Sequence, residues 1–207
     1  MDLTWLDVSS TLGLAATAVL TFNLLLGILL STAYRRSPLW KGLPAWLKKV
    51  SLDDLHNWTA YLALVLALAH PLLLLPYAAE RYRLADVVFP LHAPHQPLWT
   101  CLGSLALYAL IAVILTTQKA VKNRVGFRTW KNIHLISYGT ALLFVVHGIV
   151  MDPDLKDRPV DWLDAEKLLS EICGIVLIAA TFVRYRHYRR ALQRQKAGSS
   201  KFLCSGP

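Results

Sequence analysis

The stretch His56-Asn-Trp-Thr-Ala-Tyr-Leu-Ala-Leu-Val-Leu-Ala-Leu-Ala-His70 places an almost continuous apolar run between two histidines. A bilayer crossing needs about 20 mostly apolar residues. Backbone groups in lipid must be hydrogen-bonded internally, so such segments are helices, and period-two alternation, which would indicate a barrel, is absent from them. We therefore expect an all-α integral membrane bundle of about five transmembrane helices, formed by Ser9–Ala33, Trp58–Ala79, Leu98–Gln118, Ile133–Met151 and Leu168–Arg184.

The composition agrees with a protein solvated by lipid. Hydrophobic residues make up 55% of the chain and charged residues 17%, with a mean hydropathy of +0.42, whereas about a quarter of a soluble domain is charged. No Lys or Arg precedes the first segment, which is also too long for the core of a signal peptide. We expect one transmembrane domain over residues 1–194, followed by a disordered C-terminal tail over residues 195–207.

The net charge of +9 follows the predicted topology. Counted along the chain, alternate loops hold 17 and 5 of the basic residues. The positive-inside rule therefore predicts an outer N-terminus and a cytoplasmic C-terminus, with the first and third loops also cytoplasmic. This distribution argues against a nucleic-acid partner. We expect an integral protein of a plasma membrane, specifically the bacterial inner membrane.

Two of the predicted helices carry two histidines each. His70 and His147 lie inside apolar runs, and His56 and His134 precede or open the same segments. Ionisable side chains within a bilayer are rare and usually functional. The spacings of 14 and 13 residues correspond to about 21 and 20 Å of helix. Because both segments run outward, we predict that His56 is level with His134 near the cytoplasm, and His70 with His147 near the outside.

Two level pairs of imidazoles, separated by most of the bilayer, favour two haems. Each pair could hold one haem iron from both faces, which leaves no open position and suits electron transfer. Zinc or copper would need ligands that converge within a few ångströms. We therefore predict two b-type haems between the second and fourth segments, with the iron ligands His56, His70, His134 and His147. The alternative is that these histidines only pack in the bundle.

One detail of the spacing does not fit an ideal helix. Thirteen residues turn through about 220° net, so His134 and His147 should not share a face. A tightened turn near His134, or a deformation around Gly139, would bring them into line. The three cysteines contain no Cys-x-x-Cys motif, which argues against covalent haem and iron–sulfur clusters. Cys101 and Cys173 fall near the outer ends of their helices, so either a disulfide or two buried thiols is possible there.

Haem propionates are anionic and need cationic partners. On the cytoplasmic side Lys49, Arg128 and Lys131 are candidates, and on the outer side Arg81. Alternatively, these basic residues serve only to set the topology of the chain, as the positive-inside rule describes. In the outer loop, His92 and His95 either are solvated or contact the outer haem or an electron acceptor, whereas the basic run around His187 anchors the last helix. Trp58, Tyr138 and Phe144 could pack against porphyrin, although ordinary bundle packing explains them equally well.

The segments His56-Asn-Trp-Thr…Leu-Ala-His70 and Trp130-Lys-Asn-Ile-His134…Val-Val-His147 resemble the ferric reductase-like transmembrane domain family. That family includes NADPH oxidases, ferric reductases and the haem subunit of a bacterial methionine sulfoxide reductase system. The resemblance covers roughly residues 52–190 and implies a haem-dependent oxidoreductase component. Full-length oxidases continue into flavin and nicotinamide domains, but no Gly-x-Gly-x-x-Gly occurs here. The family commonly has six helices, and the one missing here would be the first.

The resemblance leaves the electron donor and acceptor to be identified. We expect a cytoplasmic flavoprotein or a quinol as donor and an acceptor on the outer side. The alternatives are a dihaem cytochrome b anchor subunit of a larger respiratory complex and a structural membrane protein without a cofactor. Basic inner loops would attract an acidic donor. Electrons would then leave past an acidic outer loop, which contains Asp152, Asp154, Asp157, Asp161, Asp164 and Glu166.

Overall fold

The computed structural model describes residues 4–32, 38–76, 82–151 and 167–204. In that part of the chain it is helical without strands, which confirms the predicted all-α class. The long helices are α1 (Trp5–Leu30), α4 (Leu52–Leu72), α6 (Pro97–Thr117), α8 (Phe127–Val150) and α9 (Leu168–Cys204). Short elements connect them: α2 (Pro38–Gly42), α3 (Ala45–Lys48), α5 (Leu84–Val88), the 3₁₀ turn η2 (Pro90–His92) and α7 (Lys119–Val125).

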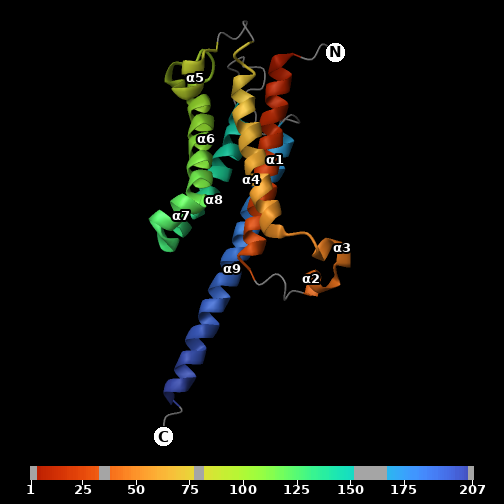
Figure 1. Ribbon diagram of the computed structural model, residues 1–207, viewed down its shortest axis with the longest axis vertical. Helices are drawn as coiled ribbons and strands as arrows, with labels where there is room; N and C mark the ends of the chain where they lie inside the picture. The colour runs from red at the N-terminus through yellow and green to blue at the C-terminus, as the bar shows by residue number, and fades with distance from the viewer. Residues whose placement is uncertain (1–3, 33–37, 77–81, 152–166, 205–207) are drawn as a thin grey trace.

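The long helices run alternately down and up the bundle (Figure 1). α1 packs along α4, and α6 packs along α8, while α9 contacts both α1 and α8. Alanines occupy the tightest contacts between these helices, with at most 2% of their surface exposed, at positions Ala16, Ala63, Ala106 and Ala141. Small residues let helix backbones approach closely, which is how helices associate in lipid.

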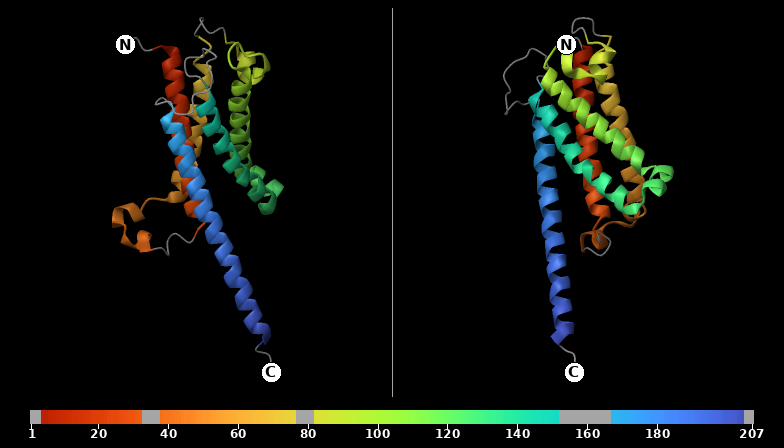
Figure 2. Two further views of the ribbon diagram at one scale, coloured as in Figure 1. Left: turned by 180° about the vertical axis from the view of Figure 1, so that it is seen from behind. Right: turned by 90° about the vertical axis from the view of Figure 1, so that its left-hand side faces the viewer.

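Four described helices are long and apolar enough to cross a bilayer: α1, α6, α8 and the Leu168–Arg190 part of α9. The remaining predicted span, Trp58–Ala79, corresponds to α4, a helix of 21 residues that begins earlier, at Leu52, and ends at Leu72. α4 is not among these four because polar residues near both of its ends lower its mean hydropathy. It nevertheless runs beside α1 within the bundle (Figure 2). Large apolar side chains such as Val65, Ile175 and Ile178, each at least 60% exposed, point outward, as expected of a surface that lipid covers.

Local sequence sets the helix ends. Thr4 and Asp7 form a capping box at the start of α1, where each side chain bonds the backbone N–H of the other residue. Ser51 caps α4 by accepting from the backbone of Asp54. Gly126, with a φ of +80°, separates α7 from α8 in a conformation that glycine adopts at little cost. The capping side chains of Thr4 and Ser51 define where α1 and α4 begin, and Gly126 allows a short turn between α7 and α8.

α9 extends beyond the predicted span Leu168–Arg184 and is helical as far as Cys204. The predicted division between a domain over residues 1–194 and a tail over residues 195–207 stays a prediction, and residues 205–207 lie outside the described part. The extension leaves the bundle at the end that carries α2, α3 and α7 (Figure 1). Its sequence is rich in Arg, Gln, Lys and Ala, which all favour helix. Cys101 on α6 and Cys173 on α9 are free thiols in this structure.

Candidate functional site

The structure brings the four membrane histidines together as two pairs. The ring centroids of His56 and His134 are 6.1 Å apart with an angle of 75° between the ring planes. Those of His70 and His147 are 6.3 Å apart with an angle of 74°. α4 supplies one ring of each pair and α8 supplies the other. Since these two helices run in the same direction, the two pairs lie one above the other along the bundle.

α8 achieves this pairing as a regular helix. It is α-helical from Phe127 to Val150, without the 3₁₀ turn near His134 that we considered. The helix is instead inclined to α1 and α4 (Figure 2). Because an inclined helix presents a changing face to its neighbour along its length, both histidines can meet α4.

In the outer pair, His70 and His147, each ring is hydrogen-bonded through its Nδ1 atom to a backbone carbonyl of a neighbouring helix. His70 Nδ1 lies 2.7 Å from the carbonyl oxygen of Ser9, and His147 Nδ1 lies 2.9 Å from that of Trp99. A carbonyl oxygen can only accept, so Nδ1 carries the proton in both rings. The Nε2 atoms therefore keep their lone pairs, which is the state in which imidazole binds a metal.

The inner pair, His56 and His134, is less symmetric. His56 Nδ1 donates to the carbonyl oxygen of Asn23 at 3.1 Å. His134 Nδ1 is buried without a hydrogen-bond partner among the described residues. The His134 ring instead stacks on Trp130, with centroids 5.3 Å apart and planes 21° apart, and Lys122 Nζ lies 3.9 Å from the centroid of the Trp130 ring.

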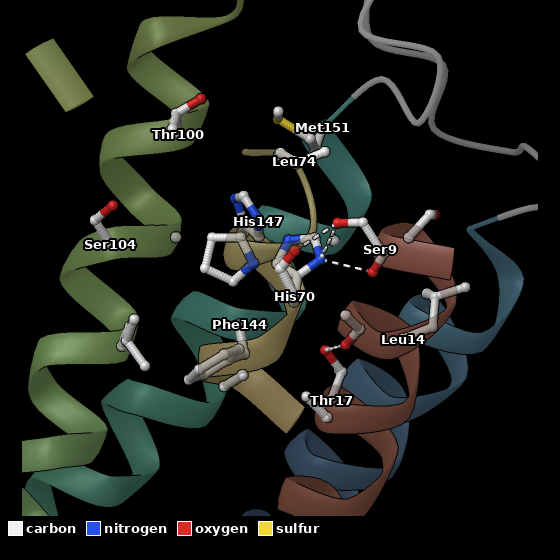
Figure 3. A pocket seen from close by; sticks show the side chains of 18 of the residues that line it. Ser9, Leu14, Thr17, His70, Leu74, Thr100, Ser104, Phe144, His147 and Met151 are labelled. Atoms are coloured by element: carbon white, nitrogen blue, oxygen red, sulfur yellow. Dashed lines mark hydrogen bonds between the residues drawn. The ribbon is translucent and has the colours of Figure 1, made fainter. Parts of the chain in front are cut away.

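A partly enclosed cavity surrounds the outer pair (Figure 3). It contains about 1220 Å³ of space, part of which is open to the outside. The two imidazoles lie close together in its wall, one from α4 and one from α8, and Phe144 and Ser104 of α6 also line it. The walls are mostly apolar with a few hydroxyl groups, which is the usual composition of a cofactor site.

The predicted propionate partners that the structure describes, Lys49, Arg128 and Lys131, have exposed side chains. Lys49 follows α3, which projects from the side of the bundle (Figure 1), and its side chain is exposed. Arg128 and Lys131 are exposed on the first turns of α8. Arg81 and the acidic outer loop of residues 152–166 lie outside the described residues. Trp58 is 73% exposed.

Besides Lys122, two cationic side chains that the sequence analysis did not select as propionate partners lie beside the inner pair or line the outer cavity. The guanidinium of Arg184 on α9 donates to the hydroxyl of Tyr138 and lies 5.6 Å from the centroid of that ring. Tyr138 is one helical turn after His134, so Arg184 lies beside the inner pair. Lys167, only 5% exposed, lines the outer cavity. In the sequence, Arg184 differs from the other basic residues of α9 only in being the first one after an apolar run.

Comparison with known proteins identifies a family for this chain. The family model described as "Ferric reductase like transmembrane component" matches residues 12–145. The match runs from residue 12, within α1, to residue 145, within α8, and includes His56, His70 and His134, whereas His147 lies two residues beyond it. No curated protein and no solved structure matches the chain significantly. Since the matched region is more than half of an all-helical, apolar bundle, the chain belongs to the family of ferric reductase-like transmembrane components.

Proposed function

We propose that this chain carries electrons across the membrane through two b-type haems, each held by two histidines. Membership of the family already makes it an integral membrane component of a transmembrane electron-transfer oxidoreductase, in a family that generally binds haem. His56 and His134 would hold the inner haem, and His70 and His147 the outer one. The observation that carries this proposal is the spacing of the imidazole rings within each pair.

The residues fit the group on simple geometry. A metal lies about 2 Å from an imidazole nitrogen, and that nitrogen lies about 1 Å from the ring centre, so two rings on opposite sides of one iron have centroids about 6 Å apart. The observed 6.1 and 6.3 Å agree with this value. Three of the four rings also direct a protonated Nδ1 to a backbone carbonyl, which leaves Nε2 free for the iron.

The haem would supply reversible one-electron chemistry, and the protein would hold it and set its environment. Carbonyl acceptors on Nδ1 fix the tautomer and orientation of a metal-binding histidine and raise its basicity. Two histidines on one iron leave no position for a substrate, so electrons would pass without binding of the acceptor to the metal. The apolar residues Phe144 and Leu107 line the cavity around the outer pair and would give the group a largely apolar environment.

Arg184 and Lys167 are our first candidates for partners of the anionic propionates. Arg184 is supported by its position beside His134 and Tyr138, and Lys167 by its position in the wall of the outer cavity. Lys49, Arg128, Lys131 and Arg81 remain predictions. A guanidinium can bind a carboxylate through two parallel hydrogen bonds, which favours Arg184 over exposed lysines.

Electrons would enter at the His56–His134 end, from a cytoplasmic flavoprotein or a quinol, and leave to an outer acceptor. This direction is supported by the clustering of basic elements α2, α3, α7 and the α9 extension at one end of the bundle (Figure 1). Basic surfaces favour encounter with acidic partners. The acidic loop proposed to face the acceptor lies outside the described residues.

A pyridine haemochrome assay on the purified protein tests the proposal directly. We expect about two haems per chain and the sharp α band of low-spin b haem in the reduced spectrum. The matched control is the variant His187→Ala, which removes an exposed histidine from α9 and should keep both haems. A wild-type protein that purifies folded and without haem would overturn the proposed function.

A further inference from the structure

Three glycines on neighbouring helices face three of the four paired histidines. A Cβ atom added at Gly13 would lie 3.1 Å from His70 Nδ1, and one added at Gly27 would lie 3.2 Å from His56 Cε1. A Cβ added at Gly103 would lie 2.7 Å from His147 Cε1, which is closer than real side chains approach. The imidazoles therefore occupy the space that a side chain would take at these positions.

Each of these glycines lies four residues after the carbonyl that its histidine uses. Ser9 precedes Gly13, Asn23 precedes Gly27, and Trp99 precedes Gly103 by this interval. A helical side chain leans toward the N-terminus and covers the preceding turn. Glycine leaves that turn open, so an imidazole can lie flat enough against the helix to donate to the carbonyl. We call this combination of carbonyl and glycine a cradle.

The two cradles on α1 are reinforced by a second hydrogen bond in the opposite direction. Ser9 Oγ donates to the backbone oxygen of His70 at 2.7 Å (Figure 3). Asn23 Nδ2 donates to the backbone oxygen of His56 at 2.5 Å. Ser9 and Asn23 are only 1% and 7% exposed. Each of these residues therefore both accepts from the imidazole and donates to the main chain of the same histidine.

The spacing of the cradles matches that of the histidines. Gly13 and Gly27 are 14 residues apart on α1, as are His56 and His70 on the antiparallel helix α4. In this way α1, which supplies no metal ligand in our proposal, sets the height and rotation of both histidines of α4. α6 does the same for His147 alone. His134 has no such cradle among the described residues and stacks on Trp130 instead.

We propose that Gly13, Gly27 and Gly103, each with the carbonyl one turn earlier, are positioning residues that orient the haem-binding imidazoles and fix their tautomer. This inference rests on the proposed function. It makes the two haems unequal, because both histidines of the outer pair are held in cradles and only His56 of the inner pair is. Loss of a partner behind a metal-binding histidine typically lowers the affinity for the metal roughly 10- to 100-fold.

The test is a set of alanine variants in the full chain. Gly13→Ala and Gly103→Ala should weaken the outer haem, and Gly27→Ala the inner haem, each roughly 10- to 100-fold in affinity. The readouts are haem per chain, a redox titration that resolves two transitions, and the low-spin electron paramagnetic resonance signal of each haem. In every variant the other haem should keep its wild-type transition and signal.

Two glycines of the same bundle provide matched controls. Gly139→Ala on α8 places a methyl group where no atom lies within 4 Å. Gly174→Ala on α9 places one 3.0 Å from the side chain of Val145, so it is a steric control without a histidine. Both should retain wild-type haem content and signals. If Gly103→Ala does not fold, Gly13→Ala and Gly27→Ala keep the test, because their contacts exceed 3.0 Å.

The outcomes separate this inference from the proposed function. A wild-type protein with two haems, and glycine variants that retain both with unchanged signals, would overturn the cradles and leave the function standing. Equal changes at both haems, or equal changes in the two controls, would also overturn the cradles, since the effect would then be general packing. A wild-type protein without haem would overturn the function and this inference together.

Discussion

At the scale of single residues, the four histidines share a chemistry and differ in what holds them. His56, His70 and His147 each donate from Nδ1 to a main-chain carbonyl of another helix. His134 relies on the aromatic face of Trp130. A hydrogen bond fixes both the ring plane and the tautomer, whereas stacking fixes only the plane. The inner site should therefore tolerate less disturbance around its second ligand than the outer site does.

The pairing of the rings predicts how single histidine variants group. His70→Ala and His147→Ala should each remove the outer haem, while His56→Ala and His134→Ala should each remove the inner one, because an iron that loses one of two axial ligands is held weakly. A redox titration of the four purified variants measures which transition disappears. If His56→Ala and His70→Ala abolished the same transition, the pairs would be assigned wrongly.

The stacking of Trp130 on His134 predicts an effect restricted to the inner haem. Trp130→Ala should lower inner-haem affinity by roughly twofold to tenfold, since an aromatic pair contributes about 0.5–1.5 kcal/mol. Trp130→Phe should retain most of the affinity. Trp58→Ala is the control, because Trp58 is 73% exposed on α4. Haem titration into the purified variants gives the affinities, and an equal loss in Trp58→Ala would contradict the role of the stack.

At the scale of helices, α9 is tied to the histidine-bearing helix α8 near the inner pair. Arg184 donates to the Tyr138 hydroxyl and lies over the same ring. A charged side chain at this level is usually paired and functional. The next basic residue along α9, Arg186, lies over Phe182 on the exposed side of the helix. The two arginines therefore differ in environment although they are two residues apart.

This difference predicts unequal consequences of two matched substitutions. Arg184→Gln should destabilise the protein by about 1 kcal/mol, the usual net contribution of a hydrogen bond, and weaken the inner haem if Arg184 pairs with a propionate. Arg186→Gln should leave both properties unchanged. Thermal unfolding in detergent and haem content measure the two effects. Identical behaviour of the two variants would show that Arg184 has no role beyond the surface.

At the scale of the whole molecule, the antiparallel long helices gather most of the basic elements at one end. The short helices α2, α3 and α7 and the extension of α9 all lie there (Figures 1 and 2). The positive-inside rule applies to short loops near helix ends, so this end should be cytoplasmic. The histidine pair at that end is His56 and His134, which the proposed route uses for electron entry.

Reporter fusions test this orientation. A fluorescent protein fused after residue 207 should be fluorescent in the cytoplasm, and a phosphatase inserted after His92 in the η2 turn should be active outside. The expectation follows from the distribution of 17 and 5 basic residues between alternate loops. A silent fluorescent fusion combined with an inactive phosphatase at His92 would indicate the reverse orientation, and the proposed direction of electron flow would reverse with it.

The sequence by itself determined where the helices lie and at which level along them each histidine is placed. Apolar runs of membrane length require helices, and a fixed rise per residue makes His56 level with His134 and His70 level with His147 once the topology is known. These are properties of single segments, so no packing information was needed. Each of the five predicted segments overlaps a long helix, although α4 begins and ends about six residues before the predicted bounds Trp58 and Ala79, and α9 extends past the predicted Arg184.

Only the tertiary structure decided which faces meet. The inclination of α8, the carbonyls of Ser9, Asn23 and Trp99, and the glycines that expose them belong to contacts between helices far apart in the sequence. Rotation of a helix about its axis depends on how neighbouring side chains interlock, which a single segment does not specify. For the same reason Arg184 reads as one more basic residue in the sequence and lies beside His134 only after α9 packs on α8.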